Sequence, residues 1–223
     1  ADAGGVHVFP LAKASESRCS PPPPSGNTCL LPVRARARKN IGEALLLCSL
    51  CEGEEHFAVT LPPESPADLA VYTQWKELTK ELRLPLSYEI GRGRSIDDLY
   101  VGARAALTCS VREGYGYAFV EPWLYGRPLL GRDIPSITAD LKRCGLHMHL
   151  YSRLSAPCAG GELEVVRETL IDRARRAFAA RGHTLPAPLH RSLAESVGNT
   201  HTVDFAKMPA RMQQRVVRRS ALS

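Results

Sequence analysis

The sequence of 223 residues predicts an α/β protein: a parallel sheet with helices on both faces, followed by a basic helical C-terminal segment. Two observations lead to this fold class. Apolar runs typical of strands alternate with helical patterns between residues 29 and 131, and such alternation calls for parallel strands joined by crossover helices. Positive charge is also concentrated at one end, because residues 167–223 hold 11 Lys and Arg against 4 Asp and Glu, and the first 166 residues hold 18 against 19.

The composition is that of a globular protein. Hydrophobic residues make up 44% of the chain and charged residues 23%, which argues against a wholly disordered chain or a coiled coil. No stretch approaches the roughly 20 apolar residues of a membrane helix, and residues 1–10 lack the pattern of a secretory signal. We therefore expect a cytoplasmic protein without a transmembrane segment. The basic residues crowd into one segment with few aromatic residues, so we expect no nucleic-acid partner.

The N-terminal segment, residues 1–28, is expected to be irregular. A strand-like piece, Gly5 to Leu11, is separated from the rest by the proline run Ser20 to Asn27. Each proline fixes φ and removes a backbone donor, so this run should be extended and exposed.

Residues 29–160 are predicted to form one sheet-containing domain. A helix is expected to begin at Asn40, a residue that favours helix starts, and another at Ser95 for the same reason. Pro62 and Pro63 should end the second strand. The expected strands are 29–33, 56–61, 86–90, 105–110 and 128–131, and the expected helices are 40–51, 68–84, 95–103 and 117–125.

Beyond Ile137 the pattern weakens. Glu162 to Arg181 predicts a helix whose late positive charges suit the helix dipole. Further helices are expected at 189–197 and 209–219 after a loop at 182–188. Residues 161–223 are thus predicted to form the basic helical segment.

Several side chains that suggest chemistry have simpler interpretations. The seven cysteines are odd in number and spread along the chain, which favours buried, reduced thiols. Cys48 and Cys51 form a CxxC without a second pair, and His147 and His149 lack a third ligand, so no metal site is expected. Trp75, Trp123 and Cys109 are expected to belong to the core, and Arg132-Asp133 is expected to form a local turn.

Three groups of residues fall on the predicted loops that follow strands, where open α/β sheets bind ligands. Cations from Arg34 to Lys39 precede a helix and could hold a phosphate or diphosphate, although a solvated basic loop has the same composition. Gly114 and Gly116 allow a ligand to approach the backbone closely, with Glu113 at the mouth of the turn; a plain turn would also use such glycines. Glu121 could accept two hydrogen bonds from a vicinal diol such as a ribose. Together the three groups suit a nucleotide sugar.

The segment from Glu113 to Glu121, EGYGYAFVE, resembles the E-x7-E motif of retaining glycosyltransferases with the GT-B fold. The likeness extends over residues 29–140. SIDDLY at residues 95–100 and ALTCS at 106–110 resemble the helix and strand before the motif, and GRPLLG at 126–131 resembles the strand after it. Arg34 and Lys39, five residues apart, resemble the Arg and Lys that hold the donor diphosphate.

The resemblance implies a Rossmann-like fold and a role for each matched residue. Arg34 and Lys39 would neutralise the diphosphate and stabilise the departing nucleoside diphosphate, and Glu113 would lie by the donor sugar. The backbone of Gly114, Tyr115 and Gly116 would grip sugar and phosphate. Glu121 would bind the ribose hydroxyls. The family needs no metal, so neither metal nor cofactor is expected, and the nucleotide sugar is a substrate.

The chain also departs from the family. GT-B enzymes have two Rossmann-like domains, and this sequence has room only for the C-terminal, donor-binding half; the acceptor half would be a further domain or a partner chain. Arg38-Lys39-Asn40 replaces the usual Lys-Gly pair, so either Arg38 or Lys39 could be the phosphate contact. The predicted function is retaining glycosyl transfer to an unidentified acceptor. A non-catalytic sugar-nucleotide-binding subunit is the alternative, and a dinucleotide-binding oxidoreductase is disfavoured because no GxGxxG follows the first strand.

Overall fold

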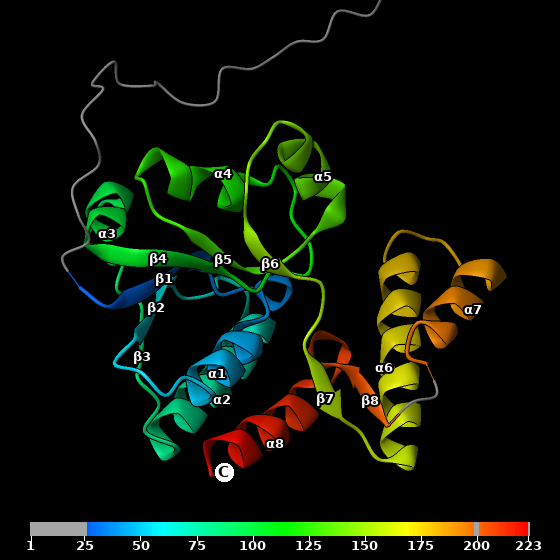
Figure 1. Ribbon diagram of the computed structural model, residues 1–223. Coiled ribbons are helices and arrows are strands. Elements are labelled where there is room, and N and C mark those ends of the chain that lie inside the picture. The colour runs from blue at the N-terminus through cyan, green and yellow to red at the C-terminus, as the bar shows by residue number, and fades with distance from the viewer. Residues whose placement is uncertain (1–25, 199–200, 223) are drawn as a thin grey trace, which may run out of the picture.

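The computed structural model describes residues 26–198 and 201–222, and its centre is a six-stranded, wholly parallel sheet (Figure 1). The strand order is β3-β2-β1-β4-β5-β6. The chain therefore builds outward from β1 in one direction and then returns to β1 to build in the other. The strands are β1 (Thr28–Arg34), β2 (His56–Leu61), β3 (Leu86–Tyr88), β4 (Ala103–Thr108), β5 (Leu129–Arg132) and β6 (His149–Tyr151).

Helices cover both faces of the sheet, as the alternating pattern predicted (Figure 1). One face carries α1 (Ile41–Ser49), α2 (Pro66–Glu81) and α8 (Ala210–Ala221). The other carries α3 (Ile96–Gly102), α4 (Tyr117–Leu124) and α5 (Pro135–Arg143). Each face has its own apolar core. Val59, Trp75 and Val217 belong to the first core, and Leu30 and Phe119 belong to the second. This α/β, Rossmann-like architecture confirms the predicted fold class.

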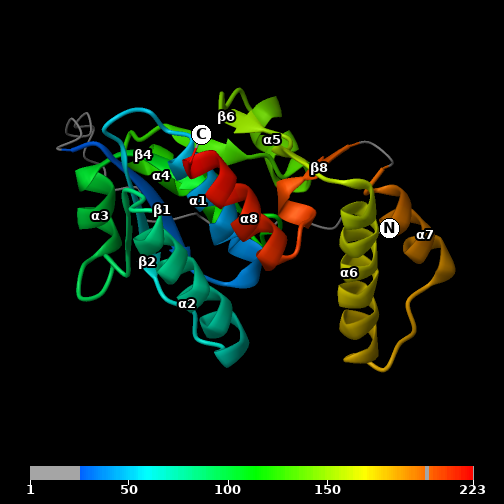
Figure 2. The same cartoon turned by 90° about the horizontal axis from the view of Figure 1, so that it is seen from below.

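The C-terminal part leaves the sheet and then returns to it. After β7 (Ser155–Pro157), α6 (Gly160–Ala179) and α7 (Ala187–Glu195) form a hairpin beside the sheet domain (Figure 2). β8 (Thr202–Asp204) pairs antiparallel with β7, and α8 packs against α1 and α2. Buried Met212 and Val217 therefore make α8 part of the same core as the sheet.

The helices and strands predicted between residues 29 and 131 are all present, with ends shifted by a few residues. The three later helices are present as well. The sequence patterns did not predict α5, β6, β7 and β8, three of which are strands of three residues. The strand-like piece Gly5 to Leu11 and most of the proline run lie outside the described residues.

Three expectations about individual side chains need correction. Trp123 was expected in the core but is 39% exposed, because the face of α4 that packs against the protein is the one that carries Phe119 and Pro122. Cys144 is exposed and Cys51 partly exposed, whereas the other cysteines of the described ranges are buried free thiols. Arg132 is buried in an ion-pair network and does not form a local turn.

Within residues 26–198 and 201–222, no cluster of three His, Cys, Asp or Glu could hold a metal, and no helix is long and apolar enough to cross a membrane.

Candidate functional site

The candidate site lies where the strand order reverses, between the carboxyl ends of β1 and β4. Parallel sheets bind ligands in this position because the two loops diverge there and leave a crevice. The loop after β1 forms a 3-10 turn, Ala37–Lys39, and enters α1 through Asn40, whose φ of 50° is left-handed. Asn tolerates that conformation better than most residues other than Gly. The amide of Val111 donates to the carbonyl of Arg38 over 2.9 Å, which ties the two loops together.

Glu113 is the centre of the charges at this crevice. Arg38 Nη1 donates to its Oε2 over 2.8 Å, and Lys39 Nζ donates to its Oε1. The side chains of Glu113 and Lys39 are only 7% and 12% exposed. Burial by itself would raise the pKa of Glu113, but the hydrogen bonds from Lys39 and Arg38 outweigh burial and hold it below its ordinary value. The carboxylate is therefore charged at neutral pH and holds both cations in place.

A cavity of about 360 Å³ opens at this ion pair. It brings together six of the seven residues that the sequence singled out. Its lining is formed by Pro32, Arg38, Lys39, Glu113, Gly114, Tyr115, Gly116, Tyr117, Ala118 and Glu121. The amides of the glycine turn and the start of α4 thus meet the cations of the first loop, an arrangement suited to a phosphate ester.

The glycine turn uses its two glycines differently. Gly116 has a φ of 75°, and a Cβ there would collide with Ile137. Gly116 is therefore required by the backbone and by packing. A Cβ at Gly114 would meet no atom within 4 Å, so the space beside it is open to the cavity.

Glu121 lies on α4 at the edge of the cavity. One of its oxygens, Oε2, accepts a hydrogen bond from the Tyr100 hydroxyl over 3.0 Å. Tyr100 is fully buried and stacks on Tyr125 with ring centroids 4.5 Å apart. The carboxylate is thus held in one orientation by a rigid aromatic support.

Arg34 is the one predicted residue that the structure does not bring to this cavity. Its Nη1 donates to the carbonyl of Pro62 over 3.1 Å, and its Nε lies 3.4 Å from Glu64. Both partners follow β2, on the far side of β1 from β4. Arg38, which the sequence left as an alternative to Lys39, binds Glu113 together with Lys39.

The sequence patterns did not predict a buried network of ion pairs and hydrogen bonds that contacts the end of the cationic loop at Asn40. Arg132 donates to both carboxylate oxygens of Glu43, over 2.9 and 2.6 Å, and to Asp204 over 2.8 and 2.9 Å. Glu43 also accepts from Tyr151 over 2.7 Å and from Asn40 over 2.8 Å. Asn40 directly follows Lys39, so the network fixes the end of the cationic loop. The residues around Glu43 in the sequence do not indicate that it pairs with Arg132, which lies 89 residues further along the chain.

No protein-family model matches the sequence, and no curated protein matches it. Among solved structures, a TarM variant from S. aureus in complex with Fondaparinux, alpha-GlcNAc-glycerol and UDP matches 60% of this chain and 28% of its own, at 14% identity and a TM-score of 0.42.

Two further structures cover 90% of this chain. The pneumococcal O-GlcNAc transferase GtfA in complex with UDP and GlcNAc matches at 13% identity and a TM-score of 0.40, over 36% of its own length. The GtfA/B complex matches at 14% identity and a TM-score of 0.44, over 37% of its chain. This chain thus spans little more than a third of those proteins at most.

Proposed function

We propose that this chain is the donor-binding half of a GT-B glycosyltransferase, which transfers a sugar from a nucleotide sugar to an acceptor with retention of configuration. The observation that supports the proposal most strongly is the cavity between the carboxyl ends of β1 and β4. It combines two cations, an ionised carboxylate, a glycine turn and a second carboxylate on the next helix. The E-x7-E resemblance assigns Lys39, Glu113, the glycine turn and Glu121 to the donor, with Arg38 as the alternative to Lys39.

The chemistry assigned to the cavity is electrostatic. Lys39 and Arg38 are held by Glu113 before any ligand arrives, so little reorganisation is needed when a diphosphate approaches. As the bond from the sugar to the diphosphate breaks, negative charge grows on the leaving oxygen, and fixed cations stabilise it. No metal is needed for this step, since the cations supply the charge. Glu121, oriented by Tyr100, would accept hydrogen bonds from the ribose hydroxyls.

The alternative function is a sugar-nucleotide-binding subunit that completes an active site only with a partner chain. The GT-B architecture that the sequence resembles uses two Rossmann-like domains around one cleft, and in this alternative the partner chain would supply the other side of the cleft. Both functions require the same donor cavity. They differ in whether this chain transfers sugar without another polypeptide.

A matched pair of variants tests the ribose contact that both functions share. Glu121→Ala is expected to weaken binding of UDP, GDP or ADP, whichever binds, by about tenfold, the loss typical of a charged hydrogen-bonding group. Glu77→Ala removes an exposed carboxylate from α2 and should leave calorimetric affinity unchanged. Equal affinity of the two variants would contradict the ribose role.

Retention is tested on the product. If the purified chain transfers sugar to water or to an added acceptor, proton NMR of the first product gives its anomeric configuration. The same configuration as the donor supports the retaining mechanism, and the opposite configuration rejects it. Transfer only after a partner chain is added would favour the subunit.

A further inference from the structure

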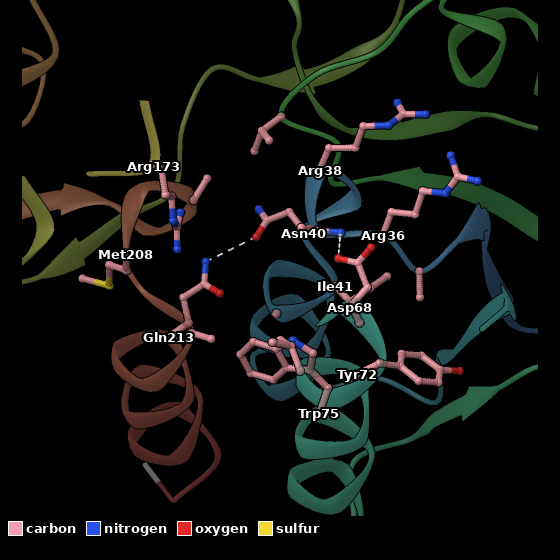
Figure 3. A pocket seen from close by; sticks show the side chains of 17 residues that line it. Arg36, Arg38, Asn40, Ile41, Asp68, Tyr72, Trp75, Arg173, Met208 and Gln213 are labelled. Carbon is pink, nitrogen blue, oxygen red and sulfur yellow. Dashed lines mark hydrogen bonds between the residues drawn. The ribbon is translucent and has the colours of Figure 1, made fainter. Parts of the chain in front are cut away.

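A second cavity, of about 370 Å³, lies on the other side of the cationic loop (Figure 3). It is bounded by residues 35–42, by the start of α2, by Arg173 of α6 and by the segment 206–213 before and within α8. Neither the resemblance nor the donor chemistry assigns it a role. Arg38 lines both cavities, so they share one wall.

One part of this cavity is apolar and firmly built. Tyr72 and Trp75 of α2 are 2% and 4% exposed, and Met208 and Ile41, which also line the cavity, are buried as well. Figure 3 shows the Trp75 ring between α1 and α8, below Asn40 and Gln213. Gln213 is itself fixed, because its Nε2 donates to the carbonyl of Phe205 over 2.9 Å and to Asn40 over 3.3 Å. Buried side chains of this kind give a shaped, apolar floor.

The rim of the cavity is cationic. Arg36 pairs with Glu64 over 2.9 Å, and Arg38 with Glu113 over 2.8 Å. Arg173 has no ion pair with any residue of the described ranges, and Figure 3 shows it extending toward Met208 and Gln213. Arg173 as a whole is exposed to solvent; partial desolvation of its guanidinium, together with the charge of Arg176, lowers its pKa below the ordinary value. The one carboxylate in the lining, Asp68, already accepts from the amide of Ala37 and the hydroxyl of Ser65.

We propose that this second cavity binds a small organic anion, a phosphate or carboxylate attached to an apolar or aromatic body. The anionic group would pair with Arg173, and the body would lie along the apolar part of the lining, next to Trp75 and Met208. An anion there pairs with a guanidinium that has no acidic partner among the described residues, and an apolar body displaces water from the apolar lining, which a fully hydrated ion would not do. The start of α1, at Ile41 and Gly42, adds the positive end of a helix dipole to the same wall.

The shared Arg38 couples the two cavities. A ligand in the second cavity that shifts this shared wall would move Arg38 relative to Glu113 and so change the charge that the donor cavity presents. Such coupling is reciprocal between two ligands. A ligand of the second cavity is therefore expected to alter the affinity for a nucleoside diphosphate, and the nucleotide to alter its affinity by the same factor.

The test uses phenyl phosphate as the probe, measured by calorimetry and by Trp75 fluorescence in a Trp123→Phe background. Phenyl phosphate should bind and quench Trp75, with inorganic phosphate at least about tenfold weaker. Arg173→Ala should weaken phenyl phosphate about tenfold, the loss expected for a charge-assisted pair. Arg175→Ala, two residues along the same helix and outside this cavity, should not change affinity. Equal loss in the two variants, or equal binding of phenyl and inorganic phosphate, would overturn the proposal.

Measuring both ligands against both variants separates failure of this proposal from failure of the donor proposal. Lys39→Ala should weaken nucleoside diphosphates and leave phenyl phosphate bound, and Arg173→Ala should do the reverse. If Lys39→Ala removes both ligands, phenyl phosphate occupies the donor cavity and the second site is rejected. A soluble anion and a lipid headgroup carry the same anionic group. Binding to vesicles of anionic phosphatidylglycerol is therefore measured to distinguish the two sources. Vesicle binding that depends on Arg173 identifies a lipid source, and phenyl phosphate binding without vesicle binding identifies a soluble one.

Discussion

Arg132 at the end of β5 and Glu43 in α1 form a bidentate ion pair in which Glu43 is completely buried. The pair joins the face of the sheet that carries α1 to the strand on the far side of the crevice. Asp204 binds the same guanidinium from β8. One arginine therefore connects α1, the sheet and the C-terminal segment beneath the cationic loop.

Replacing Arg132 by Met should destabilise the protein by about 3–5 kcal/mol, because Glu43 would keep its burial and lose its counter-charge. Urea denaturation followed by tryptophan fluorescence measures the change. Arg143→Ala is the control, since its pair with Asp140 is largely exposed and such pairs contribute about 0–1 kcal/mol. A similar small effect for both variants would show that the buried network is not needed for folding.

Gly131 should tolerate no side chain. Its φ is 131°, and a Cβ there would collide with the backbone carbonyl of Thr108 in the neighbouring strand. Gly131→Ala is expected to cost about 3 kcal/mol or more of unfolding free energy. Gly160→Ala, where a Cβ would meet nothing within 4 Å, should change stability little. Equal thermal midpoints for the two variants would contradict the close strand contact.

Glu113 should make stability depend on pH in the acidic range. Its folded pKa lies below the ordinary 4.5, so the unfolded chain binds more protons around that pH. Its contribution is therefore present above the unfolded pKa and is lost as pH falls through the folded pKa. Urea denaturation between pH 7 and pH 3 should show this loss, and Glu113→Gln should flatten the slope below pH 5. An unchanged slope in the variant would rule out Glu113 as the titrating group.

Lys39 and Arg34 should contribute unequally to diphosphate binding. Lys39 lines the cavity, whereas Arg34 is engaged by Pro62 and Glu64. Lys39→Ala is expected to weaken a bound nucleoside diphosphate by about tenfold or more, and Arg34→Ala by less. Calorimetric affinities of the two variants decide this. A larger loss for Arg34→Ala would mean that its side chain swings into the cavity when ligand arrives.

The fold between residues 29 and 131 was predictable because its elements carry their own local signals. Ser95 caps α3 by accepting a hydrogen bond from the amide of Asp98, and Pro62 directly follows β2. The later strands are three residues long, too short for an apolar pattern to develop. Helical spacing predicts which face of a helix is buried, but it does not predict how much of each side chain on that face the neighbouring elements cover. Trp123 was therefore predicted to be core although it is partly exposed.

The candidate site was predictable in part for a related reason. Glu113, the glycines and Glu121 follow one strand closely, so their grouping depends on short-range structure alone. Lys39 joins them because parallel strands end at one edge of the sheet. The orientation of Arg34 and the partners of Arg132 depend on a backbone carbonyl and a carboxylate that lie 28 and 89 residues away along the chain. No local pattern contains that information, and only the packed structure supplies it.

The most direct test of the donor cavity is a calorimetric titration of the wild-type chain with UDP, GDP and ADP, each compared with its parent nucleoside. The cations of the cavity are placed for a diphosphate, and so one nucleoside diphosphate should bind at least about tenfold more tightly than its nucleoside. If no diphosphate binds, or if nucleoside and diphosphate bind equally, the assignment of this cavity to a nucleotide sugar is contradicted.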